Sequence, residues 1–112
     1  MSRKSAPTYV TAGTIFHTEP NRRVRAAGRI SSGRYQVAPP KAATIEEILD
    51  DARAYIEGYV DAGGETSGST VSLGFLVSQE AFSLSLTLPS ERTRFFAERE
   101  INIEVCFYAS AG

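Results

Sequence analysis

The sequence predicts an α+β fold in which an antiparallel sheet of five to six strands packs one face against one long helix, in the order ββ(β)αβββ. Several short segments alternate strictly between apolar and polar residues, which is typical of strands with one covered and one open face. A single segment instead repeats apolar residues at spacings of three and four, which indicates a helix. At 112 residues the chain has the size of one domain. We expect a flexible basic N-terminus at residues 1–7 and one domain over residues 8–112.

The first third of the chain contains three strand-like segments. Residues 8–17 are rich in β-branched and aromatic side chains and end in a turn sequence. Residues 23–30 alternate, with apolar side chains on one parity and arginines on the other. Residues 34–38 add a short third strand, which Pro39 and Pro40 end. A meander is the most economical connection of these strands.

The long helix is predicted to begin at Thr44, because Thr44 and Glu47 have the spacing of a capping box. In that motif the threonine hydroxyl accepts a hydrogen bond from the backbone N–H of Glu47, and the glutamate side chain accepts one from the N–H of Thr44. Gly63 and Gly64 are expected to end the helix after about four turns. The predicted buried stripe consists of Ile45, Ile48, Leu49, Ala52, Ile56, Tyr59 and Val60.

The second half of the chain predicts three further strands. Residues 71–77 and 82–88 both alternate and are separated by a tight turn near residues 79–80, which favours a hairpin. The connection over residues 89–99 is expected to hold one turn of helix capped by Ser90, with its two phenylalanines packing back on the core. The last strand is predicted to bury Ile101, Ile103, Val105 and Phe107 and to expose Glu100, Asn102, Glu104, Cys106 and Tyr108.

The open face of the predicted sheet carries polar side chains together with some apolar ones. If the apolar residues cluster, they form a surface suited to a protein partner or to a second copy of the chain. Strand edges can also pair with another chain. We therefore expect a homo-oligomer. The apolar residues assigned to this face are Tyr9, Ile15, Leu76, Cys106 and Tyr108.

The composition excludes several classes of protein. Cys106 is the only cysteine, so no internal disulfide forms and a structural zinc site lacks its usual thiolates. No run of about eighteen apolar residues is present, so we expect no membrane span. These features favour an intracellular, cytoplasmic protein without a metal or cofactor.

No catalytic motif is recognisable, and we assign no catalytic residue. The glycine-rich stretch at residues 63–70 follows a helix and lacks the lysine of a phosphate-binding loop. His17 is either a polar residue at a strand end or a general base that uses a carboxylate from another segment. Cys106 is either a packing residue or a reactive thiol, and packing is the better interpretation. An enzyme with a pocket between helix and sheet remains an alternative.

Charge is distributed very unevenly along the chain. Residues 1–43 carry a net charge of +7, whereas residues 44–112 carry −8. Five arginines lie on or beside the second predicted strand, where they would bind an anion or nucleic acid. Pairing with Glu100 and Glu104 on another strand would neutralise them, and a pI near 5.8 argues against a nucleic-acid binder. These candidate anion-binding residues are Arg22, Arg23, Arg25, Arg29 and Arg34.

The outer face of the predicted helix is acidic. It is either a solvated face or a docking surface for a basic protein. Our first interpretation is therefore a small non-enzymatic interaction protein, of the regulator, inhibitor or immunity type, that binds a macromolecular partner through its charged faces or its open sheet. Nucleic-acid binding and catalysis are the alternatives. The candidate partner-binding residues of the helix are Glu46, Glu47, Asp50, Asp51 and Glu57.

Overall fold

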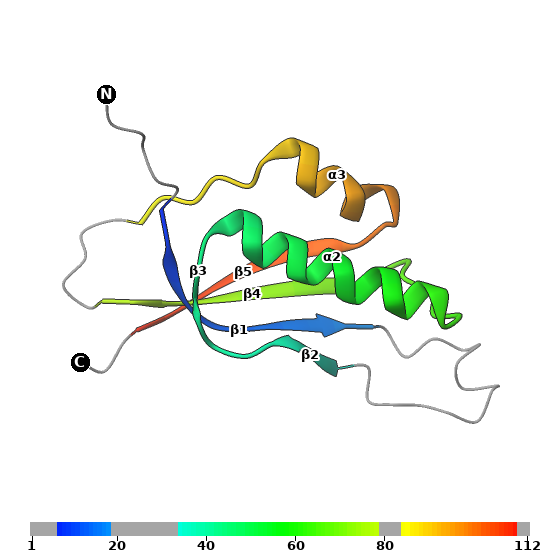
Figure 1. The fold of residues 1–112 in the computed structure, drawn as a ribbon, viewed down its shortest axis with the longest axis horizontal. Coiled ribbons are helices and arrows are strands. Elements are labelled where there is room, and N and C mark those ends of the chain that lie inside the picture. Colours follow the sequence, from blue (N-terminus) through cyan, green and yellow to red (C-terminus); the bar gives the residue numbers. More distant parts are fainter. Residues whose placement is uncertain (1–6, 19–33, 79–83, 110–112) are drawn as a thin grey trace.

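The fold is a mixed five-stranded sheet with two helices packed on one of its faces (Figure 1). The computed structural model describes residues 7–18, 34–78 and 84–109, and every structural statement below refers to these residues. Their elements are β1 (Tyr9–His17), β2 (Arg34–Ala38), β3 (Ala42–Ala43), α2 (Ile45–Asp61), β4 (Thr70–Val77), α3 (Ser90–Glu98) and β5 (Asn102–Ala109).

The strand order is β2-β1-β4-β5, and β3 pairs with the beginning of β1. The central strand β1 is antiparallel to β2, β3 and β4, whereas β4 and β5 are parallel. The prediction of a purely antiparallel sheet is therefore wrong. The chain leaves β4 and returns through α3 to the same end of the sheet, and a crossover of this kind is what parallel strands require.

The expected hairpin partner of β4 is absent from the described part of its segment. Residues 84–89 pair with none of the described strands. Their alternating leucines Leu86 and Leu88 instead pack against the hydrophobic core, and the Tyr9 hydroxyl donates a 3.2 Å hydrogen bond to the carbonyl of Ser85. The alternation of apolar and polar residues is explained by side chains that pack against the core. The backbone of this segment forms no ladder with a described strand. Residues 82–83 and the predicted turn at residues 79–80 lie outside the described residues.

The second helix is longer than the single turn expected. It spans nine residues, and both Phe95 and Phe96 are buried as predicted. Ser90 does not cap it, because the helix begins at Ser90 itself with Pro89 in the N-cap position and no side-chain cap. The guanidinium of Arg99 lies 3.8 Å from the centre of the Phe95 ring, so a cation–π contact covers this end of the core.

The capping box at the start of α2 is confirmed. The backbone N–H of Glu47 donates to the Thr44 hydroxyl at 3.1 Å, and the N–H of Thr44 donates to the Glu47 carboxylate at 2.8 Å. Tyr59 of the predicted stripe packs partly buried, but Val60 is 40% exposed. At 100° per residue Val60 lies about 60° from Ile45, at the margin of the buried face. The stripe residues that are fully buried are Ile45, Ile48, Leu49, Ala52 and Ile56.

An aromatic cluster fills the core between β1, β2 and the last turns of α2. Phe16 is completely buried, and its ring centre lies 5.1 Å from that of Tyr59, with Tyr35 and Tyr55 also in contact. Edge-to-face aromatic pairs of this kind add stability beyond the burial of their area. This cluster fixes the helix over the edge formed by β1 and β2.

The last strand follows its predicted parity but is less buried than expected. Ile101 is buried, Ile103 and Val105 are half-buried, and Phe107 is 52% exposed. The reason is that β5 is an edge strand of the described sheet and helix α3 covers only its beginning.

Two predicted segments fall outside the described residues: the strand at 23–30 and nearly all of the N-terminus at 1–7. The strands predicted at residues 8–17 and 34–38 are confirmed as β1 and β2. No helix in the described ranges is long and apolar enough to cross a membrane.

Candidate functional site: the open face of the sheet

A β-bulge in β1 decides which side chains reach the open face. Thr11 pairs with Phe75, but Gly13 pairs with Gly74, so Ala12 is an extra residue in β1. Gly13 has a φ of 115°, which favours glycine. The bulge reverses the alternation of β1. Tyr9, which the sequence assigned to the open face, therefore lies on the helix side.

Tyr9 contacts Phe75 there, with ring centres 5.8 Å apart. Beyond the bulge, Ile15 and His17 project from the open face, as do Leu76, Cys106 and Tyr108 by strand register. Four of the five apolar residues assigned to this face are therefore on it.

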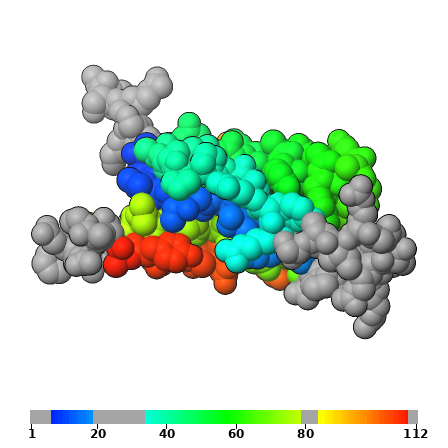
Figure 2. Space-filling view, turned by 90° about the horizontal axis from the view of Figure 1, so that it is seen from below, coloured from blue at the N-terminus to red at the C-terminus, as the bar shows by residue number. Residues whose placement is uncertain are grey.

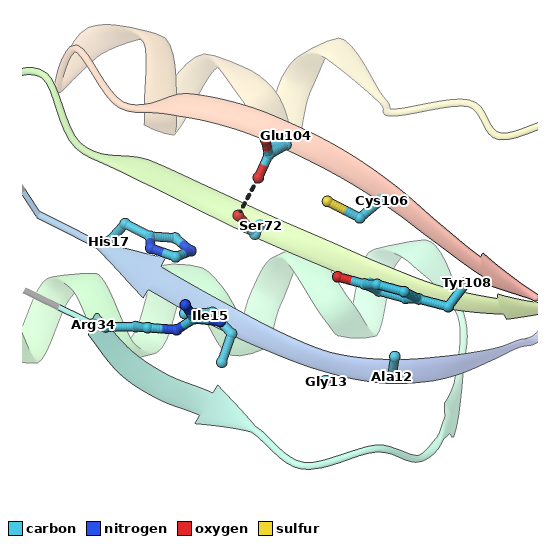
Figure 3. A pocket seen from close by; sticks show the side chains of 10 residues that line it. Ala12, Gly13, Ile15, His17, Arg34, Ser72, Glu104, Cys106 and Tyr108 are labelled. Atoms are coloured by element: carbon cyan, nitrogen blue, oxygen red, sulfur yellow. Dashed lines mark hydrogen bonds between the residues drawn. The ribbon is translucent and has the colours of Figure 1, made fainter.

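A hollow of about 490 Å³ lies on the open face (Figure 3). Its volume is within the range of small-ligand sites, but it is shallow and spreads over β1, β4 and β5 with Arg34 of β2 at one end. In Figure 3 the helices lie behind the sheet and the labelled side chains project toward the viewer. Figure 2 looks onto this side, where β1 in blue, β4 in yellow-green and β5 in orange and red lie next to one another. The lining residues are Ala12, Gly13, Ile15, His17, Arg34, Ser72, Gly74, Glu104, Cys106 and Tyr108.

The polar centre of the hollow is a pair formed by Ser72 and Glu104. These residues are direct partners in the parallel pairing of β4 and β5, and the Ser72 hydroxyl donates a 2.6 Å hydrogen bond to Oε1 of Glu104. This bond lowers the pKa of Glu104, with smaller contributions from the Cys106 thiol and the charge of His17. Glu104 is therefore a carboxylate at neutral pH, and His17 is close enough to stabilise it.

The Cys106 thiol lies beside this carboxylate. Burial raises the pKa of Cys106, the negative charge of Glu104 raises it further, and a hydrogen bond with Tyr108 partly offsets this. The thiol is thus protonated at neutral pH, which opposes nucleophilic reactivity. Its side chain is half-buried and lines the hollow, so the interpretation of Cys106 as a packing residue stays a prediction.

Glycine makes room for an aromatic ring in the floor of the hollow. A Cβ atom on Gly74 would lie 3.3 Å from Cε2 of Tyr108 and 3.2 Å from the carbonyl oxygen of Gly13. The Tyr108 ring therefore lies against the backbone of β4, and its hydroxyl points toward the middle of the face (Figure 3). Tyr108 remains 51% exposed. It offers a broad aromatic surface to anything that enters the hollow.

Charge divides the hollow into two sides. His17 and Arg34 are register partners on β1 and β2, and they supply the basic side. Glu104 on β5 supplies the acidic side. Because neighbouring strands are about 4.8 Å apart, β2 and β5 are separated by about 14 Å. The hollow can therefore hold a group that carries both a negative and a positive end, or two oppositely charged side chains of a protein.

The acidic residues of α2 lie on the other layer of the molecule and are largely occupied. Asp50 forms an ion pair with Arg92 at 3.0 Å, and Asp51 forms one with Lys41. Glu57 pairs with Arg53 at 3.2 Å, and Glu47 belongs to the capping box. Glu46 borders a separate hollow with Tyr9 and Pro89. Partner binding by this face stays a prediction.

The arginine-rich segment is represented by Arg34 alone. Arg22, Arg23, Arg25 and Arg29 lie outside the described residues, so the predicted anion-binding surface stays untested. Of the two glutamates expected to neutralise it, Glu104 binds Ser72 and Glu100 accepts a hydrogen bond from Ser67.

Sequence reasoning did not identify the hollow as a site. Glu104, Cys106 and Tyr108 were predicted on the exposed side of the last strand, but not beside His17. The missing information was the parallel pairing of β4 with β5, which aligns Ser72 with Glu104. Among the residues described, no group of three or more histidine, cysteine or carboxylate side chains is arranged to hold a metal ion.

Comparison with known proteins yields no match for this chain, either to a protein-family model, to a curated protein or to a solved structure.

Proposed function

We propose that this chain is a small non-enzymatic interaction protein, of the regulator or inhibitor type, that binds a partner protein through the open face of its sheet. One observation supports this most directly. The face opposite the helices presents the exposed side chains of Tyr108 and Leu76, and its hollow brings Tyr108 together with charged groups of both signs, Arg34 and Glu104.

The composition of the face suits a protein surface. Tyr108 and Leu76 are 51% and 40% exposed, and they lie side by side in the parallel register of β4 and β5. Tyrosine and arginine are enriched at the energetic centres of protein interfaces, and Arg34 borders the same hollow. The partner we expect presents an acidic group toward Arg34 and a basic or hydrogen-bonding group toward Glu104.

The open face is a better candidate than the acidic helix face, because four of the five candidate carboxylates of the helix already have partners within the chain. Asp50, Asp51 and Glu57 each form an ion pair within the chain. A basic partner would have to compete with these pairs, although exposed ion pairs are individually weak. On the open face, Glu104 is hydrogen-bonded to Ser72 but forms no ion pair with a described residue.

Affinity capture from native lysate with matched variants tests the proposal. Leu76→Ser and Arg34→Glu alter the open face, whereas Glu57→Lys alters the helix face. We expect one protein to be captured in stoichiometric amount by the wild type and by Glu57→Lys, with at least a tenfold loss for both open-face variants. Circular dichroism of each variant checks that the fold is retained.

Two outcomes of the capture would contradict the proposal. Loss of the partner in Glu57→Lys alone would assign binding to the acidic helix face. Capture of nucleic acid that disappears on nuclease treatment would favour the arginine-rich segment instead. In that case five phosphate contacts imply a slope of log affinity against log salt of roughly −4 to −5.

A second candidate function, catalysis, is supported by the placement of His17 and Glu104 in the same hollow. A histidine near a carboxylate is suited to general acid–base chemistry. The site differs from the predicted pocket, since it lies on the face of the sheet away from the helices. NMR screening of small dipolar molecules tests this alternative. Binding that is lost in both His17→Ala and Glu104→Gln would support it, and the absence of any small ligand would count against it.

A further inference from the structure

The outer edge of β5 carries backbone groups without a partner in the described part of the chain. β5 is eight residues long, and its one strand partner among those residues is β4. The Asn102 N–H donates to the carbonyl of Ser69 at 2.8 Å, toward β4. Because backbone groups alternate in direction along a strand, those of Glu104, Cys106 and Tyr108 also point toward β4. The N–H and C=O groups of Ile103, Val105 and Phe107 therefore point outward.

The two edges of the described sheet differ in how they are protected. Proteins usually guard an edge strand by making it short, or with basic residues, proline or a bulge. The β2 edge has five residues, begins at Arg34 and runs into Pro39 and Pro40. β5 has none of these features. Its one charged residue, Glu104, is held toward β4 by the Ser72 hydroxyl.

The hydrophobic core is also incomplete along β5. Val71, Leu73 and Phe75 of the neighbouring strand β4 are buried, whereas Ile103 and Val105 are only half-buried and Phe107 is 52% exposed. A groove of about 650 Å³ runs along the same side of the edge, between α3 and the beginning of β5. Its apolar lining is formed by Leu88, Phe96, Ala97, Ile101 and Ile103. An added strand with apolar side chains at alternate positions would cover this surface.

We propose that β5 of a second copy is this added strand, paired antiparallel across a twofold axis so that two sheets become one. β5 is complementary to itself. Ile103, Val105 and Phe107 direct their backbone groups toward the outer edge, where the second strand pairs, and their apolar side chains toward the helix side, where the core is incomplete. In an antiparallel pair, directly opposite residues have their side chains on the same face of the sheet. Residues whose backbone groups point toward the second strand are therefore opposite residues of the same kind. Twofold dimers are also the commonest closed assemblies.

Charge restricts the register of this pair. An axis at Glu104 would place two carboxylates directly opposite one another, which is destabilising. An axis at Val105 places Glu104 opposite Cys106 of the second copy, and an axis at Cys106 places it opposite Tyr108. Both of these registers join apolar residues on the helix side. The net charge of −1 per chain produces little repulsion between copies.

The dimer has a consequence for the open face. With the axis perpendicular to the sheet, both open faces point the same way, and the two hollows adjoin along β5. Glu104 and Tyr108 of each copy then lie near the centre of one larger surface. This inference goes beyond the proposed function, because it names an assembly partner and an interface distinct from the rest of the open face.

Light scattering coupled to size exclusion tests the dimer. The wild type is expected at twice the chain mass of 12.1 kDa. Val105→Pro removes an N–H that points outward and leaves the β4 ladder intact, so we expect a monomer. Val105→Thr keeps the shape and the N–H, and is the matched control that remains dimeric. Phe107→Lys places a charge at the exposed edge and is a second variant expected to be monomeric.

The outcomes separate this inference from the proposed function. Leu76→Ser and Arg34→Glu should remain dimeric even where they lose the partner protein. A wild type that stays monomeric up to millimolar concentration would overturn the inference, as would dimers of folded Val105→Pro and Phe107→Lys. A monomer that binds a strand of a foreign protein at β5 would equally overturn it.

Discussion

The Ser72 hydroxyl donates a 2.6 Å hydrogen bond to Oε1 of Glu104 and joins β4 to β5 on the open face. This is the strongest single contribution to the lowered pKa of Glu104. Ser72→Ala is therefore expected to raise the pKa of Glu104 toward its ordinary value of 4.5. NMR titration of the Glu104 side-chain carboxyl measures the change, and an unchanged pKa in the variant would show that another group holds the carboxylate.

The same carboxylate makes stability depend on pH. The pKa of Glu104 is lower in the folded protein, so its contribution is present above the unfolded value of 4.5 and is lost as pH falls through the folded value. We expect the free energy of unfolding to fall less steeply below pH 4.5 in Glu104→Gln than in the wild type. Urea denaturation at several pH values measures both slopes. Parallel profiles for the two proteins would count against this linkage.

Cys106 should react slowly with thiol reagents at neutral pH, because burial and the charge of Glu104 raise its pKa above 9.0. Glu104→Gln removes the charge and is expected to move the inflection of the alkylation rate to lower pH. Stopped-flow alkylation of the folded protein across pH 6–10 measures it. A faster reaction in the wild type than in Glu104→Gln would contradict the prediction.

The capping box at Thr44 is expected to stabilise α2. Thr44→Ala leaves the backbone N–H of Glu47 without its hydroxyl partner and should lower the free energy of unfolding by about 1 kcal/mol. Thr87→Ala, at an exposed position, is the control and should change it by less than about 0.5 kcal/mol. Urea denaturation compares the two. Equal effects would mean that the motif contributes nothing specific.

Substitution by alanine should change the free energy of unfolding in opposite directions at two glycines near the end of α2. A Cβ atom on Gly58 meets nothing within 4 Å, so Gly58→Ala should stabilise the helix by about 0.5–1 kcal/mol. A Cβ atom on Gly64 would lie 2.3 Å from Cε2 of Tyr59, which packs against Phe16. Gly64→Ala should therefore lower the free energy of unfolding, by about 1–3 kcal/mol. A melting temperature that changes in the same direction in both variants would contradict the predicted opposite effects.

Local patterns predicted the helix well, because its signals lie within a few residues of one another. Thr44 and Glu47 are three apart, and the buried face of α2 follows the helical period from Ile45 to Ile56. Val60 was predicted to be buried but is exposed, because its position around the helix axis is at the margin of the buried face. The strand at 34–38 was likewise marked by the prolines that follow it.

The sheet was harder to predict because pairing is a long-range choice. Residues 84–88 alternate like a strand, yet Leu86 and Leu88 pack on the core from a segment that pairs with none of the described strands. Tyr9 appeared on the wrong face because one extra residue, Ala12, reverses the parity of β1. The Ser72–Glu104 pair required the parallel register of β4 and β5, which alternation alone does not determine.

Photo-crosslinking from two matched positions tests whether the partner binds to the open face of the sheet. A photoreactive phenylalanine analogue is placed at Leu76 on the open face, or at Glu57 on the outer face of α2, and the protein is irradiated in native lysate. We predict a crosslink to one protein of discrete mass from position 76 and none from position 57. A crosslink from position 57 alone would contradict binding by the open face and assign it to the helix face.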